Sequence, residues 1–525
     1  MKKIIGLLAI IFNSISINAQ PALSQAKCDN IWALGYGTYT GAAQDGCSVF
    51  DFPQPTPVLA YSKIVFSETD SNMSDTLGNL LFYTNGVQVY NKNYQKMCGS
   101  DTLNQGYYSW GYCDLGCRIN QGVISLPQPG HSNTYYLFHS RVPNTDIDGH
   151  KEGVYYSTID ISQDNGLGCV TSLRNPIITN DSLDGRMTAC RHANGRDWWI
   201  IVFRFKTGEY MPILLDPQGV HLTTWHRAAP KSLFTFHGSL GQSCFSPDGN
   251  YFATNTSLSQ LGGYFSLYHF DRCNGSLSLR DTLYYNNDYG YYVSPGTAFA
   301  QNSTKLYFNN YEHIYQYDLN SAQSIKLALD TVAIYDGYTY VIPNTPPSVG
   351  TLYTSFRLAQ LAPDGKIYLS SSTSTNCLHV IDKPDEAGAA CHVIQRGLAL
   401  AYWNLLSLPN YPNFRLGSLD GSSCDTLGID NVVATAALPR KEEIAKVFPN
   451  PANDILNIET KNNTIFLSYK IYDILGREVQ TGTATNAIST QKLQNGIYFL
   501  SINTLATDGT HGLGGGAIKI IVQHP

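Results

Sequence analysis

Charged residues and long apolar runs are both scarce in this sequence. Of its 525 residues only 14% are charged, and the net charge at pH 7 is −6. Lysine and arginine nowhere gather into a block that could neutralise a row of phosphates, so we expect no nucleic-acid partner. Beyond the amino-terminal segment no run of about 18 apolar residues occurs, so we expect no transmembrane segment. No long stretch has the spacing of an amphipathic helix, which argues against a helical fold.

The amino terminus has the pattern of a secretory signal. Lys2 and Lys3 precede an apolar stretch at residues 4–12, and the small residue Ala19 follows a polar stretch. A basic region, a short apolar core and a small residue at the cleavage point are typical of a signal peptide, and this core is too short to cross a bilayer. The sequence therefore predicts a signal peptide at residues 1–20 and export of the remaining chain.

All twelve cysteines lie between Cys28 and Cys424. An exported chain folds in an oxidising compartment, which favours disulfides over metal ligands. Two pairs are predicted: Cys244 with Cys273, which fall in one predicted blade, and Cys377 with Cys391, which flank a probable hairpin.

A short phrase recurs along the chain. Residues 246–255 read SPDGNYFATN, and residues 362–371 read APDGKIYLSS. In both, a Pro-Asp-Gly turn leads into an alternating strand of aromatic and β-branched residues. Looser copies occur elsewhere, and the strands of the six copies are centred at Phe82, Tyr136, Trp199, Phe252, Tyr307 and Tyr368.

The spacing of these strands predicts the architecture. Neighbouring centres lie 53 to 63 residues apart, about 57 on average, which fits one four-stranded blade of a β-propeller. Residues 28–424 span about seven such periods. The sequence thus predicts an all-β chain with a seven-bladed β-propeller at residues 28–424. We expect the seventh blade to be assembled from residues 28–52 and 398–416, which would close the ring and remove an exposed sheet edge.

The last part of the chain has a different texture. Residues 425–446 combine small residues with a charged patch and contain no turn-strand phrase, so they are predicted to be a linker. Residues 447–525 contain short alternating strands bounded by Gly, Asn or Pro, as expected of a small antiparallel β-sandwich.

This last segment resembles the C-terminal sorting domain of the type IX secretion system of Bacteroidetes, in its type A form. Three motifs carry the resemblance: PNPA at 449–452, YDILGREV at 472–479 and GIYFL at 496–500. The insertion at 504–517 departs from the family pattern. Within the motifs, the sorting residues that the resemblance implies are Pro449, Asn450, Pro451, Asp473, Gly476, Gly496 and Tyr498.

The resemblance implies a route for the protein. It covers about a sixth of the chain and implies the type IX secretion machinery as a partner, with a secreted or outer-membrane-surface location after removal of the tail. Residues 28–424 also resemble, more loosely, the propellers often joined to such tails, through GNLLFYTNGVQVYN, DRCNGSLS and LPNYPNF. That second likeness implies a fold and no activity.

Three links between predicted blades are rich in tyrosine. They lie at residues 106–112, 283–292 and 335–341, each before the first strand of a blade, so a propeller would place them at one face. Rings interleaved with Asn, Asp and Gly are typical of a sugar or peptide platform, although the same rings could instead pack blade against blade. The candidate residues for a glycan or protein ligand are Tyr107, Tyr108, Trp110, Tyr112, Tyr289, Tyr291 and Tyr338.

Signals for catalysis or metal binding are weak. Residues 237–241, HGSLG, lack the GxSxG spacing of a serine hydrolase. Asp146 and Asp148 could present oxygens to calcium but lack the later acidic residue of an EF-hand loop. Asp184 and Glu209 could cleave a glycosidic bond only if the fold brings their carboxylates within about 5 to 10 Å. We therefore predict no catalytic residue, no metal and no cofactor.

These features predict an exported, cell-surface or secreted propeller that acts as a binding or interaction module. The alternative is a propeller enzyme, a polysaccharide lyase or glycoside hydrolase, with its site in the central channel. A third possibility is a structural or adhesive surface component, which needs neither exposed aromatic loops nor acid and base groups in the channel.

Overall fold

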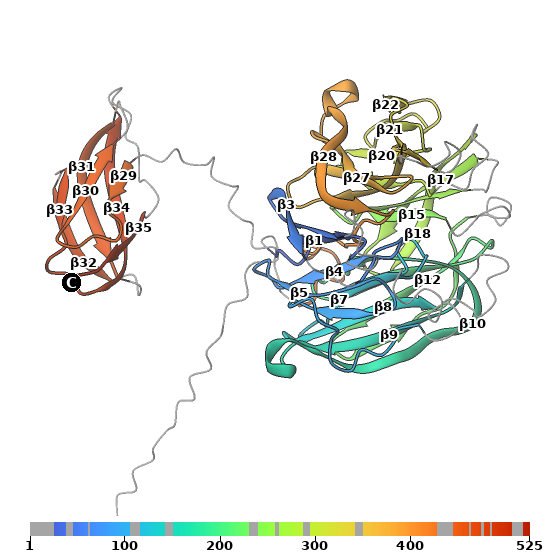
Figure 1. Cartoon of the computed structure of the whole chain (residues 1–525), viewed down its shortest axis with the longest axis horizontal. Helices are drawn as coiled ribbons and strands as arrows, with labels where there is room; N and C mark the ends of the chain where they lie inside the picture. The colour runs from blue at the N-terminus through green and yellow to red at the C-terminus, as the bar shows by residue number, and fades with distance from the viewer. Residues whose placement is uncertain are drawn as a thin grey trace, which may run out of the picture. The chain divides into compact units, whose positions relative to one another are not determined.

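The structure is a computed structural model of the chain. It describes residues 26–37, 46–60, 64–104, 116–141, 151–229, 240–257, 262–286, 294–341, 350–427, 445–460, 464–473, 477–483, 486–506 and 518–524. The predicted signal peptide and most of the predicted linker lie outside these residues. The chain divides into two compact units, Met1–Val432 and Val433–Pro525, and β-strands make up nearly all regular structure in both (Figure 1).

Two three-stranded sheets begin the first unit. The first sheet contains β1 (Ile31–Gly35), β2 (Cys47–Asp51) and β3 (Gln54–Ala60). The second contains β4 (Ser71–Ser74), β5 (Leu80–Thr84) and β6 (Val89–Asn91). Every pairing is antiparallel and joins neighbours in sequence, as in a meander.

The next sheet has eight strands and contains two meanders that share one long strand. Its members are β7 (Val123–Pro127), β8 (Thr134–Arg141), β9 (Lys151–Asp160), β10 (Cys169–Arg191), β11 (Trp198–Arg204), β12 (Glu209–Asp216), β13 (Gly219–Leu222) and β14 (His226–Arg227). The first part of β10 pairs with β9 and its last part with β11, with register shifts between them.

Three four-stranded meanders and a two-stranded sheet complete the first unit. The first comprises β15 (Gly241–Phe245), β16 (Tyr251–Ser257), β17 (Gly262–Asp271) and β18 (Ser276–Asn286). The second comprises β19 (Thr297–Phe299), β20 (Lys305–Asn309), β21 (His313–Asp318) and β22 (Leu329–Ile334). The small sheet is β23 (Thr339–Val341) with β24 (Thr351–Tyr353), and the last meander is β25 (Phe356–Leu361), β26 (Ile367–Ser371), β27 (Thr375–Ile381) and β28 (Val393–Asn404).

The strands predicted from the recurring turn-strand phrase occupy equivalent positions in the sheets. The six predicted centres lie in β5, β8, β11, β16, β20 and β26, each of which follows the opening strand of a meander. The turns also form as expected. Gly249 and Gly365 have φ values of 74° and 83°, and Asp248 Oδ1 accepts a hydrogen bond from the Asn250 amide at 3.0 Å. A backbone with positive φ favours glycine, which explains its place in the phrase.

Side chains from neighbouring sheets pack together to form the core of this unit. Phe265 on β17 and Phe308 on β20 stack with ring centroids 4.3 Å apart. Phe82 on β5 meets Tyr135 on β8 edge to face at 5.6 Å. Because these contacts join strands of different sheets, apolar burial stabilises the packing of each sheet on the next.

The two ends of the first unit meet, but only partly in the predicted way. The prediction that residues 398–404 join the first sheet is wrong, because they pair with β27 as part of β28. Residues 405–416, which we call the closing segment, do return to β1. Tyr411 Oη donates to the Ile31 carbonyl at 2.7 Å, and Arg415 contacts both oxygens of Asp29 at 2.6 and 2.8 Å.

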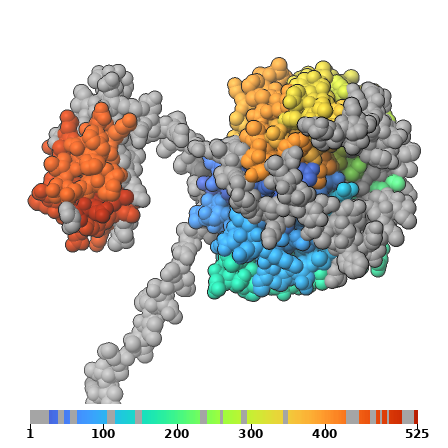
Figure 2. Space-filling view, viewed as in Figure 1, coloured from blue at the N-terminus to red at the C-terminus, as the bar shows by residue number. Residues whose placement is uncertain are grey.

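No strand pairing between the closing segment and β1 is present among the described residues. Pro409 and Pro412 lack amide donors, so this stretch cannot form a continuous ladder and uses side chains instead. The last sheet also touches the first, because the Tyr402 amide on β28 donates to Ser48 Oγ on β2 at 3.0 Å. In Figures 1 and 2 the orange strands of the last sheet accordingly lie beside the blue amino-terminal strands.

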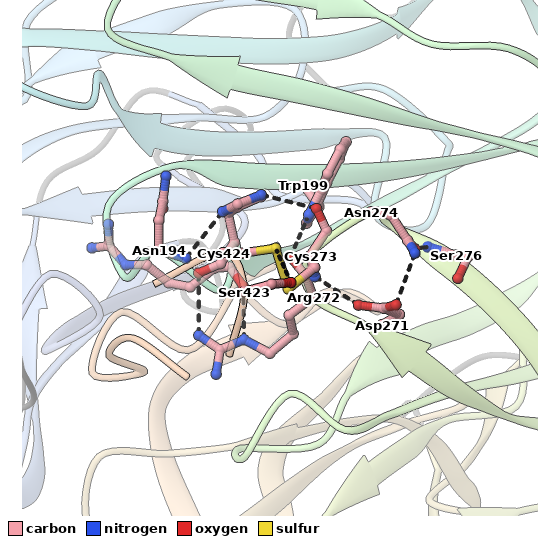
Figure 3. The surroundings of a disulfide bond; sticks show 11 residues. Asn194, Trp199, Asp271, Arg272, Cys273, Asn274, Ser276, Ser423 and Cys424 are labelled. Carbon is pink, nitrogen blue, oxygen red and sulfur yellow. Dashed lines mark hydrogen bonds between the residues drawn. A yellow bond between two sulfur atoms is a disulfide. The ribbon is translucent and has the colours of Figure 1, made fainter. Parts of the chain in front are cut away.

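Two disulfides tie distant parts of the first unit together. Cys98 bonds to Cys169, which begins β10, and Cys273 bonds to Cys424 across 151 residues of sequence. Figure 3 shows the second bond beside the turn between β17 and β18, where Asp271 Oδ1 accepts from the Cys273 amide at 2.8 Å. The chain just beyond the closing segment is therefore covalently fixed to this turn.

The predicted disulfide between Cys244 and Cys273 is wrong. Cys244 lies on β15 and Cys273 lies two residues after the end of β17, so one strand separates them in the sheet. Strands are about 4.8 Å apart, which puts β15 and β17 roughly 10 Å from each other. This exceeds the Cα separation of about 7 Å that a disulfide can bridge, and Cys244 remains a thiol.

The predicted disulfide between Cys377 and Cys391 is also wrong. The Cys391 carbonyl accepts a hydrogen bond from the Lys383 amide at 2.9 Å, just beyond the end of β27. Cys377 lies six residues before Lys383 on that hairpin arm, about 20 Å away at the rise of a strand. Both cysteines remain thiols.

The second unit consists of two antiparallel sheets. One contains β29 (Ala445–Phe448), β30 (Ile455–Thr460) and β33 (Ala487–Ser489). The other contains β32 (Glu478–Thr483), β31 (Thr464–Tyr472), β34 (Gly496–Ala506) and β35 (Ile518–Val522). Leu456 and Ile488 from the first sheet share a buried cluster with Ile471 and Leu500 from the second, so this unit has a core of its own.

Candidate functional site

Six of the seven predicted ligand residues lie outside the described residues. They are Tyr107, Tyr108, Trp110, Tyr112, Tyr289 and Tyr291. The seventh, Tyr338, directly precedes β23, and its side chain is 44% exposed. The grouping of these rings at one face therefore stays a prediction, and only the surroundings of Tyr338 can be described.

Tyr338 belongs to a group of aromatic side chains that we call the tyrosine cluster: Tyr338, Tyr340 and Trp403. The rings of Tyr338 and Tyr340 meet edge to face at 5.2 Å, and Tyr340 lies 5.9 Å from the ring of Trp403. Tyr353 on the neighbouring strand β24 is 47% exposed but pairs with Thr339, so its side chain lies on the other face of this two-stranded sheet. The cluster thus places aromatic rings on a surface formed by β23 and the end of β28.

An ion pair holds the Tyr338 ring in place. The Arg396 guanidinium lies 4.4 Å from the ring centroid and donates to both oxygens of Asp336 at 3.0 and 2.6 Å. This pairing lowers the pKa of Asp336 below its usual range. Burial raises the pKa of Tyr340 to about 12, and its hydroxyl donates to Asn376 Oδ1 at 2.7 Å. Fixed rings beside a planar cation, a carboxylate and an amide can stack on a sugar and hydrogen-bond its hydroxyls.

A second candidate site is a cavity of about 380 Å³, which we call the inner pocket. Its walls come from β10, β15, β19 and β25, from the turns that follow the last three of these strands, and from the closing segment. Lining residues from those parts are Thr188, Cys244, Phe299, Gln301, Gln360 and Arg415. The closing segment therefore forms part of the pocket wall as well as joining the two ends of the unit.

Two glutamine side chains brace the inner strands around this pocket. Gln242 Oε1 accepts from the Thr297 amide at 3.2 Å and from the Ala359 amide at 2.8 Å, which links β15 to β19 and β25. Gln121 Oε1 accepts from the Ser243 amide at 2.8 Å, and Gln121 Nε2 donates to the Ser243 carbonyl at 2.8 Å. Because these amides substitute for strand pairing, the spacing of the inner strands is fixed.

Two ion pairs with buried arginines involve residues of the inner strands β10 and β25. Arg357 Nη2 donates to Ser294 Oγ at 3.1 Å and lies 3.6 Å from Glu68 Oε1, and burial lowers the pKa of Arg357. Asp184 is paired with Arg186 at 2.8 Å. The charges of these residues are therefore balanced in pairs.

The carboxylates of Asp184 and Glu209 bind different arginines. Asp184 pairs with Arg186, whereas Glu209 pairs with Arg204 at 2.9 Å and Arg227 at 3.0 Å. The described structure thus gives each carboxylate a structural partner. Asp146, Asp148 and residues 237–239 lie outside the described residues.

Sequence reasoning missed the inner pocket. Its strands carry short polar-apolar alternations such as GQSCF and FRLAQL, which do not distinguish a pocket wall from a packed interior. The available signal was the place of these strands before the Pro-Asp-Gly phrases. Leu361 directly precedes the phrase at 362–371, and one residue separates Cys244 from the phrase at 246–255. Among the described residues no helix is long and apolar enough to span a membrane, and no group of acidic, histidine or cysteine side chains is arranged to hold a metal.

In the second unit, the first sorting motif packs against the last strand. Asn450 Oδ1 accepts from the Ile521 amide on β35 at 2.8 Å, and the Ala452 amide donates to the Ile521 carbonyl at 2.7 Å. Pro449 and Pro451 flank this contact directly after β29. The motif is therefore part of the fold of this unit.

The other two motifs lie at strand ends. Asp473 follows β31 and accepts from the Arg477 amide at 3.0 Å and from Arg477 Nε at 2.7 Å, which closes the turn. Gly496 begins β34, where Tyr498 Oη donates to the Gln494 carbonyl at 2.9 Å. Gly476 lies outside the described residues.

Residues 446–512 match the sequence profile of the secretion system C-terminal sorting domain. The chain ends in a member of this family. As the three motifs indicated, the protein is a cargo of the type IX secretion system, and its place is outside the cell or on the outer-membrane surface. The sorting domain implies an interaction with the secretion machinery.

No curated protein matches the sequence. Among solved structures, a provisionally assigned 6-phosphogluconolactonase from Bacteroides fragilis is 11% identical, with a TM-score of 0.42 over 72% of this chain and 98% of that one. A protein of unknown function from Desulfotomaculum acetoxidans is 10% identical, with a TM-score of 0.38 over 72% and 99%. PorZ from Porphyromonas gingivalis, a surface component of the type IX secretion system, is 11% identical, with a TM-score of 0.27 over 92% and 73%.

Proposed function

We propose that this cargo protein is a binding module built on a seven-bladed β-propeller, with the sorting domain as its removable tail. The meanders supply the blades: β1–β3, β4–β6, β7–β10, β10–β13, β15–β18, β19–β22 and β25–β28. Sheets that pack in sequence order and a last sheet that touches the first are what a closed ring requires.

The closing segment supports this ring. The first two sheets have three strands each where the others have four, and the closing segment lies beside β1, where the inner strand of a first blade would run. Ser407 Oγ also donates to the Phe66 carbonyl, just before β4, at 3.3 Å. These side-chain contacts between the two ends of the first unit would hold the ring closed.

The tyrosine cluster carries the binding proposal. The Arg396–Asp336 pair fixes the exposed Tyr338 ring, so stacking a ligand on that ring would cost little side-chain entropy. We propose a glycan as the ligand, because flat rings beside amide and charged groups match the apolar faces and hydroxyls of sugars.

The test measures retention of soluble polysaccharides by the mature protein in affinity electrophoresis. We expect Tyr338→Ala combined with Trp403→Ala to weaken binding at least about tenfold, since a lost stacking ring is worth on the order of 1 kcal/mol. Leu327→Ala is the matched control, because Leu327 is 75% exposed and lies outside the cluster. Retention unchanged in the double variant and in Trp110→Ala, Tyr289→Ala and Tyr291→Ala would reject the glycan site.

The enzyme alternative requires an acid and a base within a shared cavity. In the inner pocket Asp29 is paired with Arg415, and Asp248 accepts hydrogen bonds from its own turn, so neither is placed as an unpaired acid or base. Polysaccharide cleavage by the mature protein, measured as new chain ends, would favour the lyase or hydrolase over the binding module.

A further inference from the structure

We infer that the inner pocket is a second binding site, one for a small uncharged polyhydroxylated ligand such as a mono- or disaccharide. Its volume of about 380 Å³ lies in the lower part of the range of small-molecule sites. The site is separate from the tyrosine cluster, since none of the cluster residues lines the pocket.

The pocket exists before any ligand enters it. Gln242 and Gln121 hold the inner strands apart, and Gln121 Nε2 also donates to Asn410 Oδ1 of the closing segment at 3.1 Å. Asn410 in turn donates to the carbonyls of Val123 and Met187 at 2.9 and 3.0 Å. A cavity held open by satisfied buried amides is preorganised, so little ordering is needed on binding.

The two carboxylates that line the pocket already have partners: Asp29 is paired with a cation, and the oxygens of Asp248 accept hydrogen bonds from their own turn. The Asp29 carboxylate accepts hydrogen bonds from Arg415 Nη2 at 2.6 Å and from Arg415 Nη1 at 2.8 Å. Asp248 accepts from Ser246 Oγ at 2.5 Å, from the Asn250 amide at 3.0 Å and from Asn250 Nδ2 at 2.8 Å. A charged ligand would have to break one of these arrangements or remain unpaired, which is costly in a confined site. The pocket chemistry therefore selects a neutral ligand.

Polar groups in the pocket remain available for such a ligand. The Thr188 side chain is buried in the wall, and its hydroxyl makes no hydrogen bond to any described residue. Gln301 lies in the turn after β19, and its amide likewise bonds to none of the described residues. Phe245 and Phe299 add apolar surface between these groups. Hydroxyl and amide groups around aromatic rings match a sugar, which offers hydroxyls at its edge and C–H groups on its faces.

The experiment titrates the mature protein by calorimetry with glucose, galactose, mannose, maltose and cellobiose, and with glucuronate and glucosamine as charged counterparts. At least one neutral sugar should bind in the micromolar to millimolar range. Thr188→Val should weaken this binding about tenfold, because it removes a hydrogen bond and keeps the side-chain shape. Gln301→Ala should weaken it severalfold. Gln323→Ala is the matched control, an exposed glutamine between β21 and β22 outside the pocket.

Three results would overturn the inference. They are no binding of any neutral sugar at about 10 mM, binding unaffected by both Thr188→Val and Gln301→Ala, or charged counterparts that bind as tightly as their neutral parents. The tyrosine-cluster variants separate this site from the proposed glycan surface. Tyr338→Ala with Trp403→Ala should leave small-sugar binding intact, and its loss in that variant would assign the sugar to the surface instead.

Discussion

Asp70 is a buried residue of the first unit that makes the stability of the protein depend on pH. The residue is 1% exposed and accepts a hydrogen bond from Asn72 Nδ2 at 2.7 Å. Burial raises the pKa of Asp70 well above its usual range. The folded state therefore favours the protonated carboxyl, while the unfolded chain ionises near the ordinary value. Below the ordinary pKa of an aspartate, Asp70 is protonated in both the folded and the unfolded state and costs no stability. As the pH rises from that value towards the raised pKa of the folded state, the free energy of unfolding falls.

Asp70→Asn should therefore stabilise the protein at neutral pH. The amide keeps the acceptor for Asn72 and removes the ionisation, so we expect the melting temperature to rise by a few degrees at pH 7 and to change little near pH 3.5. Scanning calorimetry at both pH values measures the difference. Asp330→Asn, on the exposed face of β22, is the control and should change neither value. A melting temperature lowered at pH 7 would show that Asp70 is needed in its charged form.

At the scale of elements, the closing segment joins parts of the first unit that are far apart in sequence. Asn410 contacts β7 and β10, Tyr411 contacts β1, and Asn413 Nδ2 donates to the Pro247 carbonyl at 2.7 Å. One irregular stretch thus holds several sheets through its side chains.

Asn410→Ala should be among the most damaging single substitutions in this segment. It would leave the carbonyls of Val123 and Met187 without their donor in a buried place, which costs about 3 kcal/mol in the free energy of unfolding. Asn413→Ala removes two partly buried hydrogen bonds, to the Pro247 carbonyl and from the Arg415 amide, and should cost about 1.5 kcal/mol. Urea unfolding of both variants measures the contrast. Equal losses in the free energy of unfolding would mean that the two carbonyls bound by Asn410 do not need this donor.

At the scale of the whole molecule, the two units have separate cores, and the Cys273–Cys424 bond fixes the end of the first unit before the second begins. The sorting tail can therefore be removed without taking a structural part of the main body with it.

A chain truncated after residue 427 should keep the thermal unfolding of the first unit unchanged within about 2 °C. Truncation after Asn404 removes the closing segment and Cys424, so we expect loss of cooperative unfolding or a fall of more than about 10 °C. Circular dichroism during heating distinguishes the two. A first unit that is destabilised by loss of residues 428–525 alone would show that the tail is part of its fold.

The sequence by itself determined the recurring turn-strand phrase and the location of this protein outside the cell or on the outer-membrane surface. Turn-forming residues and strand alternation are local properties of the sequence, so Asp248 and Gly249 predicted their turn. In the same way, the motifs at Asn450 and Asp473 predicted the sorting domain. Only the tertiary structure decided the disulfide partners, the inner pocket and the path of the closing segment. These depend on which strands become neighbours: Cys273 meets Cys424 across 151 residues, and Gln242 braces β19 and β25. Residue spacing along the chain does not encode such contacts, because they arise only after the sheets have packed.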